Sequence, residues 1–496
     1  MFELAAPVPC GNRWCATCAL HVLIWVCRLE RSQNSGQPFH KKLRSHKEIR
    51  DIVEYAHDRG IRVVPEFEMP GHSTAWLVAY PELASGRAPK TIRREFGVSD
   101  YALDPTREET YEFIGRFLGE MAAIFPDPYV HIGGDETESP EWKTDPRIQG
   151  FMREHGLKDS AALQAYFNQR VLKILNGYHK HMVGWDEILN PALPADAVVQ
   201  SWRGGEALVK AAQQGHQGLL SAGYYLDGMK PAGEHYAVDP LPRGSVLTPA
   251  QRELVLGGEI CMWGEHIDER TVDSRLWPRS AAIAERLWSP ESVTDVDDLY
   301  RRLTATSIEL ERLGLRHLSA EGAGLRELAG TEEIGDLRVF ASVLEPVSFG
   351  ERYEQQKTSQ ETVLDRFVDS VRPDPPSRYE FAHLTTNFLK RPVGDGEDAR
   401  ELGAMFELLM RAGPGVQRQI KLSPLLSDVG VRAGQMPRLA AAGVEAVHFL
   451  AAGTYAPVGW KQAKLALIDE AKRPSGIVRF TFLEPLILLV EAVHER

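Results

Sequence analysis

The 496-residue chain carries a net charge of −12 at pH 7, and 43% of its residues are hydrophobic and 25% charged. This composition is ordinary for a globular protein of two to three domains, and the negative charge argues against a nucleic acid as partner. The sequence lacks the roughly 18 consecutive apolar residues of a membrane helix, so we expect no membrane span.

Residues 1–44 are expected to form an atypical N-terminal segment. Its apolar stretch 18–27 resembles a signal-peptide core, but only Arg13 precedes it as a positive charge and the alanine-type cleavage site is missing. The same stretch offers one buried strand, at 20–26. A metal or disulfide knot is the weaker interpretation of the cysteines, because no set of acids or histidines accompanies them. Four of the five cysteines lie in this segment: Cys10, Cys15, Cys18 and Cys27.

Alternating helices and strands follow. Ser45 and Glu48 form a capping box that predicts a helix ending at Gly60. Asp104 as cap, followed by Pro105 at the first helical position, predicts the start of a second helix. Six apolar strand candidates are separated by helical stretches, which implies parallel pairing. The six candidates are 61–67, 129–134, 182–185, 197–202, 218–222 and 256–263.

This alternation predicts an α/β fold, a (β/α)8 barrel of the TIM type over residues 45–318. Acidic or aromatic residues follow each strand, as at the active face of such barrels. An open doubly wound sheet would require a glycine-rich phosphate loop or a site at a switch point, and the sequence shows neither. With the candidate at 20–26, seven strands are found. The first strand is missing, and we expect an N-terminus that is truncated or altered.

Residues 319–496 are expected to form a mainly helical region without a chemical motif. Packing on the barrel, formation of a homodimer, or shaping of the substrate entrance are the roles open to it. The helix candidates are 336–344, 362–371, 397–410, 436–450 and 460–471.

The stretch Y-V-H-I-G-G-D-E at 129–136 is the strongest candidate for chemistry. A short strand ends at Gly133 and Gly134 and delivers Asp135 and Glu136 at its carboxyl end. Neighbouring residues cannot share one face of a strand, so one acid is free to stay ionised while the other holds a proton. The alternative is a loop with two solvated acids.

Six motifs together resemble the family-20 glycoside hydrolases, the β-N-acetylhexosaminidases. The resemblance covers roughly residues 45–315, and the motifs occur in the family's order. It implies retaining, substrate-assisted hydrolysis of terminal non-reducing N-acetylglucosamine or N-acetylgalactosamine through an oxazolinium, without a cofactor or a metal. The motifs are P-E-F-E-M-P-G-H (65–72), H-I-G-G-D-E (131–136), G-W-D-E (184–187), Y-Y-L-D (224–227), W-G-E (263–265) and W-P-R-S-A-A-I-A-E-R-L-W (277–288).

The resemblance also implies three catalytic roles. Glu136 would be the general acid that protonates the leaving oxygen and then the base that activates water. Asp135 would stay ionised, orient the acetamide and stabilise the charge on its nitrogen. Tyr225 would donate its hydroxyl to the acetamido oxygen, which itself attacks the anomeric carbon.

Substrate-binding roles are implied for five further residues. The rings of Trp185, Trp202 and Trp263 would wall the sugar pocket, although packing in the barrel explains any one of them alone. Asp227 and Glu265 would accept hydrogen bonds from sugar hydroxyls, with capping or solvation as their alternatives.

A second layer of polar residues is implied behind the acids. His72 would bond to Glu136 and be supported by Glu68, which stands where the family often has Asp. His131 is interpreted as a packing residue of its strand.

Two departures from the family pattern lie near the N-terminus. The family's first strand supplies an arginine that clamps the sugar, and its second strand carries an H-x-H-x-x-D-like run; neither occurs in this sequence. An impaired remnant that binds amino sugars or acts as a scaffold is therefore the alternative function. A metal hydrolase built on Asp135, Glu136 and His131 is weaker, because H-x-H and H-E-x-x-H spacings are absent. The expected partner is an amino-sugar glycan, and the family suggests a periplasmic or secreted protein.

Overall fold

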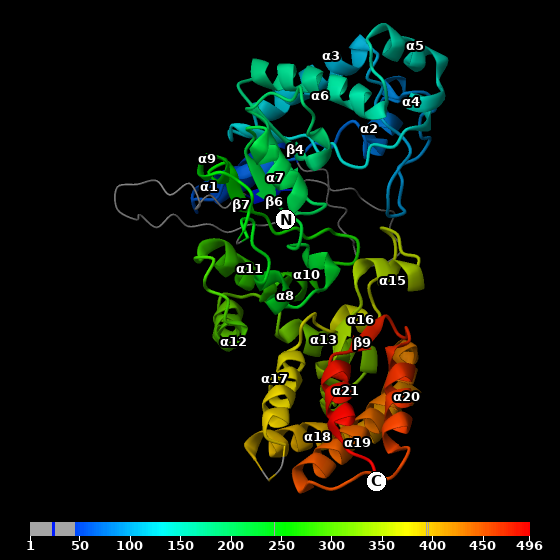
Figure 1. The fold of residues 1–496 in the computed structure, drawn as a ribbon. Helices are drawn as coiled ribbons and strands as arrows, with labels where there is room; N and C mark the ends of the chain where they lie inside the picture. Colours follow the sequence, from blue (N-terminus) through cyan, green and yellow to red (C-terminus); the bar gives the residue numbers. More distant parts are fainter. Residues whose placement is uncertain (1–21, 25–44, 243, 393, 395) are drawn as a thin grey trace.

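The computed structural model describes residues 22–24, 45–242, 244–392, 394 and 396–496. Figure 1 shows the blue-to-green part of the chain, with its strands and surrounding helices, above a yellow-to-red part built mainly of helices. Among the described residues, no helix has both the length and the apolar character that a membrane crossing requires.

Seven parallel strands follow one another in chain order within the described residues. One sheet pairs the first two strands and another pairs the remaining five, all in parallel. A parallel bridge between Glu66 and His131 joins the two sheets, and the Phe67 N–H donates to the His131 carbonyl at 2.9 Å. The strands are β1 (Val22–Ile24), β2 (Val63–Pro65), β3 (Tyr129–His131), β4 (His181–Trp185), β5 (Val198–Ser201), β6 (Gly218–Leu220) and β7 (Val255–Gly258).

This arrangement confirms the (β/α) barrel predicted from the strand alternation. All six strands expected from residue 61 onward are present, although most are shorter than predicted. The strand at 20–26 is confirmed where β1 pairs with β2, and its remaining residues lie outside the described part of the chain.

Helices alternate with the strands and cover the sheet. The predicted capping box is confirmed, because the Ser45 hydroxyl accepts from the Glu48 N–H at 3.2 Å while the Glu48 carboxylate accepts from the Ser45 N–H at 2.7 Å. The longer barrel helices are α1 (His46–His57), α3 (Glu108–Ala122), α5 (Pro146–Glu154), α6 (Ser160–Gly177), α7 (Gly205–Gln213), α11 (Arg279–Trp288) and α12 (Val296–Arg312). Shorter ones are α2 (Thr74–Ala79), α4 (Pro140–Thr144), α8 (Ala232–Tyr236), α9 (Pro249–Arg252), α10 (Val272–Leu276) and the 3-10 turns η1 (Pro81–Leu83), η2 (Asp186–Ile188) and η3 (Leu226–Gly228).

The barrel core forms because alternate strand residues and one face of each helix are apolar. Val130 and Ile132 of the third strand segment pack with Phe167 and Val171 of α6 in one buried cluster. The strand therefore holds its carboxyl-terminal loop on a rigid base.

The predicted start of the second helix at Asp104 is wrong, because α3 begins only at Glu108. The buried Asp104 carboxylate accepts from the Thr106 N–H at 2.9 Å and from Arg107 Nε at 3.0 Å. These bonds hold the residues after Asp104 in a turn, so its side chain caps no helix.

The C-terminal region is helical as predicted, but four of its helices, which begin at Ser319, Phe349, Pro376 and Leu483, were not among the candidates. The candidate at 362–371 shortens to α16 (Phe367–Ser370), and an antiparallel pair, β8 (Leu344–Pro346) with β9 (Val478–Phe480), was not expected. The other elements are α13 (Ser319–Ala329), α14 (Gly335–Ser342), α15 (Phe349–Gln355), α17 (Pro376–Lys390), α18 (Glu397–Leu422), η4 (Pro424–Val429), α19 (Gly430–Ala452), α20 (Trp460–Lys472) and α21 (Leu483–Ala492).

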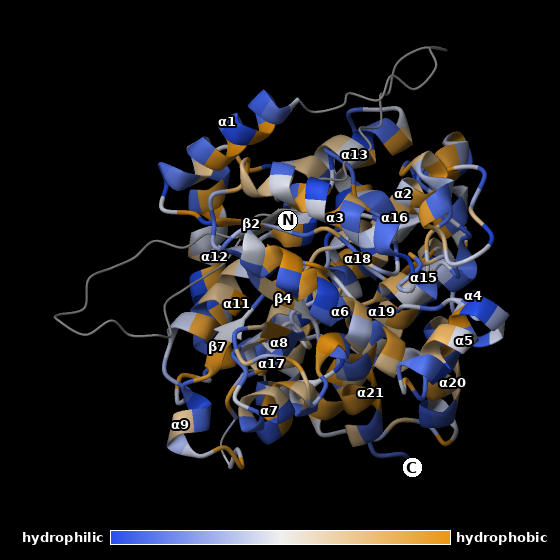
Figure 2. Cartoon of the chain, turned by 90° about the horizontal axis from the view of Figure 1, so that it is seen from above, coloured by the Kyte–Doolittle hydropathy of each residue, from blue (hydrophilic) through white to orange (hydrophobic). Residues whose placement is uncertain are grey.

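One apolar cluster that reaches from Leu325 to Val493 forms the core of this region. Helices α18 and α19 pack along each other, each with a proline inside it, Pro414 and Pro437. Figure 2 shows the contrast between a surface helix such as α1, with many hydrophilic residues, and the mostly hydrophobic α21. Four residues of α21 are buried in the cluster: Leu483, Leu486, Leu489 and Val490.

Candidate active site

The loop after β3 makes a tight turn against a buried acid. Gly133 and Gly134 have φ values of +68° and +96°, which L side chains rarely adopt. A Cβ on Gly133 would lie 1.8 Å from Glu68 Oε1, and the Gly134 N–H donates to the same oxygen at 2.8 Å. Gln164 Nε2 donates to the Gly134 carbonyl at 2.6 Å. Both glycines are thus required to bring Asp135 to this place.

Gly133→Ala is expected to destabilise the fold and to suppress activity. The backbone conformation alone costs about 1–3 kcal/mol, and the new methyl group must displace the Glu68 carboxyl. With the catalytic role expected for Asp135 from the sequence, a displacement of about 1 Å should lower the rate roughly 100-fold. Urea unfolding and steady-state kinetics check both effects. Gly205→Ala is the matched control, since its Cβ would meet no atom within 4 Å; equal effects of the two variants would contradict the prediction.

His72 stands beside both acids of the loop. Its Nε2 lies 3.4 Å from Glu136 Oε2 and 3.8 Å from Asp135 Oδ2. The Glu136 side chain is 37% exposed and that of Asp135 18%, so the two acids have different surroundings. Glu136 is accessible to solvent, whereas Asp135 lies deeper in the barrel.

Glu68 and Asp135 form a hydrogen-bonded pair of carboxyl groups. Burial raises the pKa of Glu68 well above its ordinary value, and the charges of Asp135 and Glu66 raise it further. Burial also raises the pKa of Asp135, while His72 and the hydrogen bond from Glu68 act in the opposite direction. The shared hydrogen bond raises the pKa of Glu68 and lowers that of Asp135, which corresponds to Glu68 as the donor and Asp135 as the acceptor. Glu68 contacts Asp135 and Gly134. These contacts differ from the prediction, in which Glu68 supports His72.

His131 lies beneath the loop and is fully buried. Its Nδ1 accepts from the Gly133 N–H at 2.9 Å and lies 3.2 Å from Glu66 Oε1, which also accepts from Trp185 Nε1 at 3.0 Å. Sequence reasoning missed Glu66. The available signal was the P-E-F-E pattern, because residues two apart share one face of a strand.

The described residues contain one group able to hold a metal ion, His72 with Asp135 and Glu136. These three offer ligand atoms that lie within 4.8 Å of one another. His131 is not part of this group. The metal alternative considered from the sequence therefore had the wrong histidine.

Three aromatic side chains gather beside the acids. The ring centroids of Trp185 and Trp263 are 6.1 Å apart, and those of Tyr225 and Trp263 are 6.5 Å apart. Burial, together with nearby acidic groups that include Asp227 and Asp135, raises the pKa of Tyr225 well above its ordinary value. The Tyr225 hydroxyl consequently stays protonated and able to donate.

Trp185 is more deeply buried than Trp202 and Trp263. Trp185 is only 3% exposed, so packing accounts for most of its surface, whereas Trp202 and Trp263 are half-buried. Trp202 Nε1 donates to Glu187 Oε2 at 3.0 Å, and burial raises the pKa of Glu187 to about 7.

Eight buried carboxylate oxygens have no hydrogen-bond partner among the described residues, and three of them belong to site residues predicted from the sequence. These three are Asp135 Oδ1, Asp227 Oδ1 and Glu265 Oε2, which come from the loops after β3, β6 and β7. Burial, and then the neighbouring Glu265, raise the pKa of Asp227 to about 7, and burial raises that of Glu265. Buried acceptors ordinarily have partners, so these three suit a ligand that brings several N–H or O–H donors.

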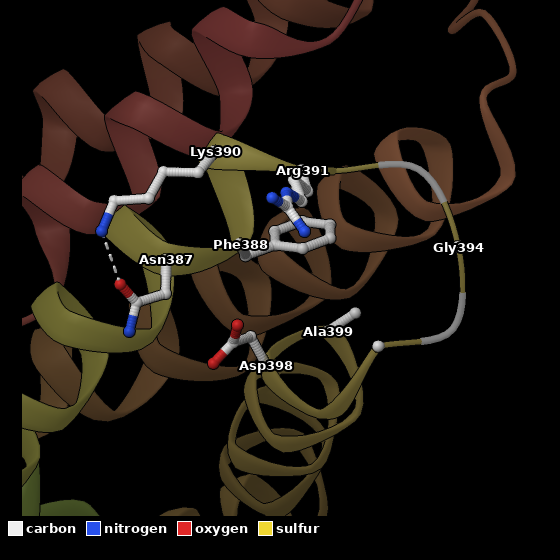
Figure 3. Close-up of a pocket in the computed structure, with 8 residues that line it drawn as sticks. Asn387, Phe388, Lys390, Arg391, Gly394, Asp398 and Ala399 are labelled. Carbon is white, nitrogen blue, oxygen red and sulfur yellow. Dashed lines mark hydrogen bonds between the residues drawn. The ribbon is translucent and has the colours of Figure 1, made fainter.

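A pocket of about 380 Å³ lies elsewhere, between the end of α17 and the start of α18. Figure 3 shows Lys390 turned back to Asn387, and the two form a hydrogen bond of 2.9 Å. The walls of this pocket include none of the residues at the strand ends. The candidate active site is therefore assigned to the barrel and not to this pocket. The lining residues are Asn387, Phe388, Lys390, Arg391, Gly394, Gly396, Asp398 and Ala399.

Comparisons with known proteins place the chain in a family. Residues 26–291, more than half of the chain, match the family described as glycosyl hydrolase family 20, catalytic domain. The chain is 38% identical over 282 residues to beta-hexosaminidase subunit alpha of Rattus norvegicus, with 54% of this chain and 52% of that protein covered. With beta-hexosaminidase subunit beta of Homo sapiens it shares 36% identity over 277 residues, with 54% and 49% covered.

A solved structure extends the similarity into the helical region. The chitobiase of Flavobacterium johnsoniae superposes with a TM-score of 0.83 at 33% sequence identity, covering 90% of this chain and 68% of that chain. The chain spans about half the length of the curated relatives that it matches.

Proposed function

Because the chain belongs to glycosyl hydrolase family 20, we propose that it is a β-N-acetylhexosaminidase acting on terminal non-reducing N-acetyl-hexosamines. The observation that carries the proposal is the set of three unpartnered carboxylate oxygens on Asp135, Asp227 and Glu265. An amino sugar brings hydroxyl and amide donors for these acceptors, and its C–H face suits the ring of Trp263. Trp185 and Trp202 complete the proposed binding residues.

The proposed mechanism uses the substrate's own acetamide as the nucleophile. Its carbonyl oxygen attacks the anomeric carbon while the bond to the leaving oxygen breaks and Glu136 supplies that oxygen with a proton. Tyr225 holds the acetamide by donating to its oxygen, which makes the attack intramolecular. Water then opens the oxazolinium, with the Glu136 carboxylate as base.

Asp135 supplies the negative charge that this route requires. Its carboxylate accepts from the acetamide N–H and stabilises the positive charge that develops on that nitrogen. A proton held on Glu68 allows Asp135 to stay ionised, because a protonated partner adds no second charge beside it. His72 lies between Asp135 and Glu136, where a positioning role for both is proposed.

The second candidate function is a remnant that binds amino sugars without hydrolysing them, or a scaffold. A homodimer is a further proposal, which light scattering tests. The division of the chain into domains at 1–44, 45–318 and 319–496 is also a proposal, which limited proteolysis tests.

Hydrolysis of 4-nitrophenyl N-acetyl-β-D-glucosaminide and its galacto epimer by the purified chain tests the proposed function. The matched substrate is 4-nitrophenyl β-D-glucopyranoside, which lacks the acetamide. Turnover of the acetamido sugars alone is the expected result. A folded chain that binds N-acetylglucosamine in calorimetry but releases no nitrophenol would establish the remnant instead.

A further inference from the structure

The loop after β7 carries Trp263 and Glu265, and the next side chain reaches into the C-terminal region. His266 is buried, and its Nε2 lies 2.8 Å from the hydroxyl of Thr358, which is also buried. The His266 ring packs at 5.3 Å from Phe349, the first residue of α15. Glu265 is thus one residue away from a buried hydrogen bond to a distant part of the chain.

Two arginines attach this part of the barrel to the same distant segment, residues 356–374, here called the strap. Arg270 lies in the loop after β7, and Arg275 lies in α10, the helix that follows the loop. Arg270 Nη2 donates to the Leu364 carbonyl at 2.6 Å. Arg275, which is fully buried, donates to the carbonyls of Val371 and Val368 at 2.6 and 2.9 Å. Buried guanidinium groups bonded to main-chain carbonyls fix direction as well as distance.

The strap is itself held against other barrel loops. The Gln360 N–H donates to the Arg94 carbonyl at 2.9 Å, and Arg94 pairs with Glu361. At its far end, Asp374 Oδ2 accepts from the Ala232 N–H at 2.8 Å and from the Tyr300 hydroxyl at 2.9 Å. The strap therefore spans the loops around residues 94, 232 and 266.

Helix α15, which leads into the strap, packs against η3, the turn that contains Asp227. Figure 1 shows α15 between the barrel elements above it and the remainder of the helical region below it. Both loops that carry the proposed sugar acceptors Asp227 and Glu265 are consequently backed by this part of the C-terminal region.

We propose that Thr358 is a positioning residue for Glu265, and that the strap is the means by which the helical region shapes the sugar site. The Thr358 hydroxyl fixes the His266 ring, and the ring fixes the backbone that directs the unpartnered Glu265 oxygen to the sugar. This inference rests on the proposed function, because it assumes that Glu265 binds substrate.

A double-mutant cycle tests the assignment. Thr358→Val removes the hydroxyl and keeps the shape of the side chain, whereas Thr358→Ser keeps the hydroxyl and is the matched control. Thr358→Val is expected to lower kcat/KM on the order of tenfold, mainly through KM, because His266 loses a buried partner. If Thr358 acts through Glu265, adding Thr358→Val to Glu265→Gln brings little further loss.

Hydrogen exchange of the peptide that spans 262–268 separates this test from the proposed function. Faster exchange in Thr358→Val than in Thr358→Ser, with unchanged exchange at 129–136, is expected even if the parent proves inactive. Unchanged exchange at 262–268 in Thr358→Val would overturn the assignment. Fully additive kinetic losses in the cycle would also overturn it. Absence of turnover in the parent contradicts the proposed function alone.

Discussion

Glu136→Gln is expected to lower kcat about 10²–10⁴-fold on a glycoside with a poor leaving group. Glutamine fills the same space beside His72 but has no proton to transfer to the leaving oxygen and cannot act as the base toward water. The size of the loss should depend on the leaving group. A 4-nitrophenolate leaves with little protonation, so its glycoside should lose less than a disaccharide whose leaving group is a sugar alcohol.

Glu138→Gln is the matched control, because this acid lies two residues further along the same loop and is exposed. It should behave as the parent on both substrates. Glu136 would lose its assignment as the general acid if Glu136→Gln kept the parent's kcat on the disaccharide. Equal losses in the two variants would point to the charge of the loop rather than to proton transfer.

Asp135→Asn is expected to lower kcat about 10²–10³-fold, the usual cost of removing one group that stabilises developing charge. The neutral amide no longer balances the positive charge on the acetamide nitrogen. Because Asp135 takes no part in protonating the leaving oxygen, the loss should be the same for nitrophenyl and disaccharide substrates. Kinetics with both substrates thus separates the roles of Asp135 and Glu136.

Glu68→Gln is the informative partner of Asp135→Asn. Burial and the neighbouring carboxylates raise the pKa of Glu68, so a glutamine, which also donates one hydrogen bond to Asp135, imitates the protonated acid. Activity should stay within a few-fold of the parent near neutral pH. The opposite ranking, with Asp135→Asn tolerated and Glu68→Gln inactive, would mean that the proton resides on Asp135.

The order of the strands and the position of the acidic loop could be predicted from the sequence for definite reasons. Short apolar runs bounded by helices with clear caps fix the strand order, as at Ser45 and Glu48. Gly133 and Gly134 mark the end of a strand because the turn requires positive φ values there. Parallel strands bring their carboxyl ends together, which placed the loops of Asp135, Tyr225 and Glu265 at one face.

The partners of the buried groups could not be predicted in the same way. Glu68 is four residues from His72 in sequence, yet it bonds Asp135 and Gly134, which are more than sixty residues away. The hydrogen bond between His266 and Thr358 joins residues 92 positions apart, and no local pattern marks it. Asp104 has the residue type of a helix cap, but bonds to Thr106 and Arg107 decide its conformation.

The measurement that most directly tests substrate-assisted hydrolysis is kcat for 4-nitrophenyl β-glucosaminides that carry N-acetyl, N-fluoroacetyl or N-trifluoroacetyl groups. Fluorine withdraws electron density from the amide oxygen and weakens it as a nucleophile without changing the leaving group. If the acetamide attacks the anomeric carbon, kcat must fall steeply as fluorines are added. A kcat that does not change across the series would show that the acetamide is a bystander, and would assign the attack to a carboxylate or to water.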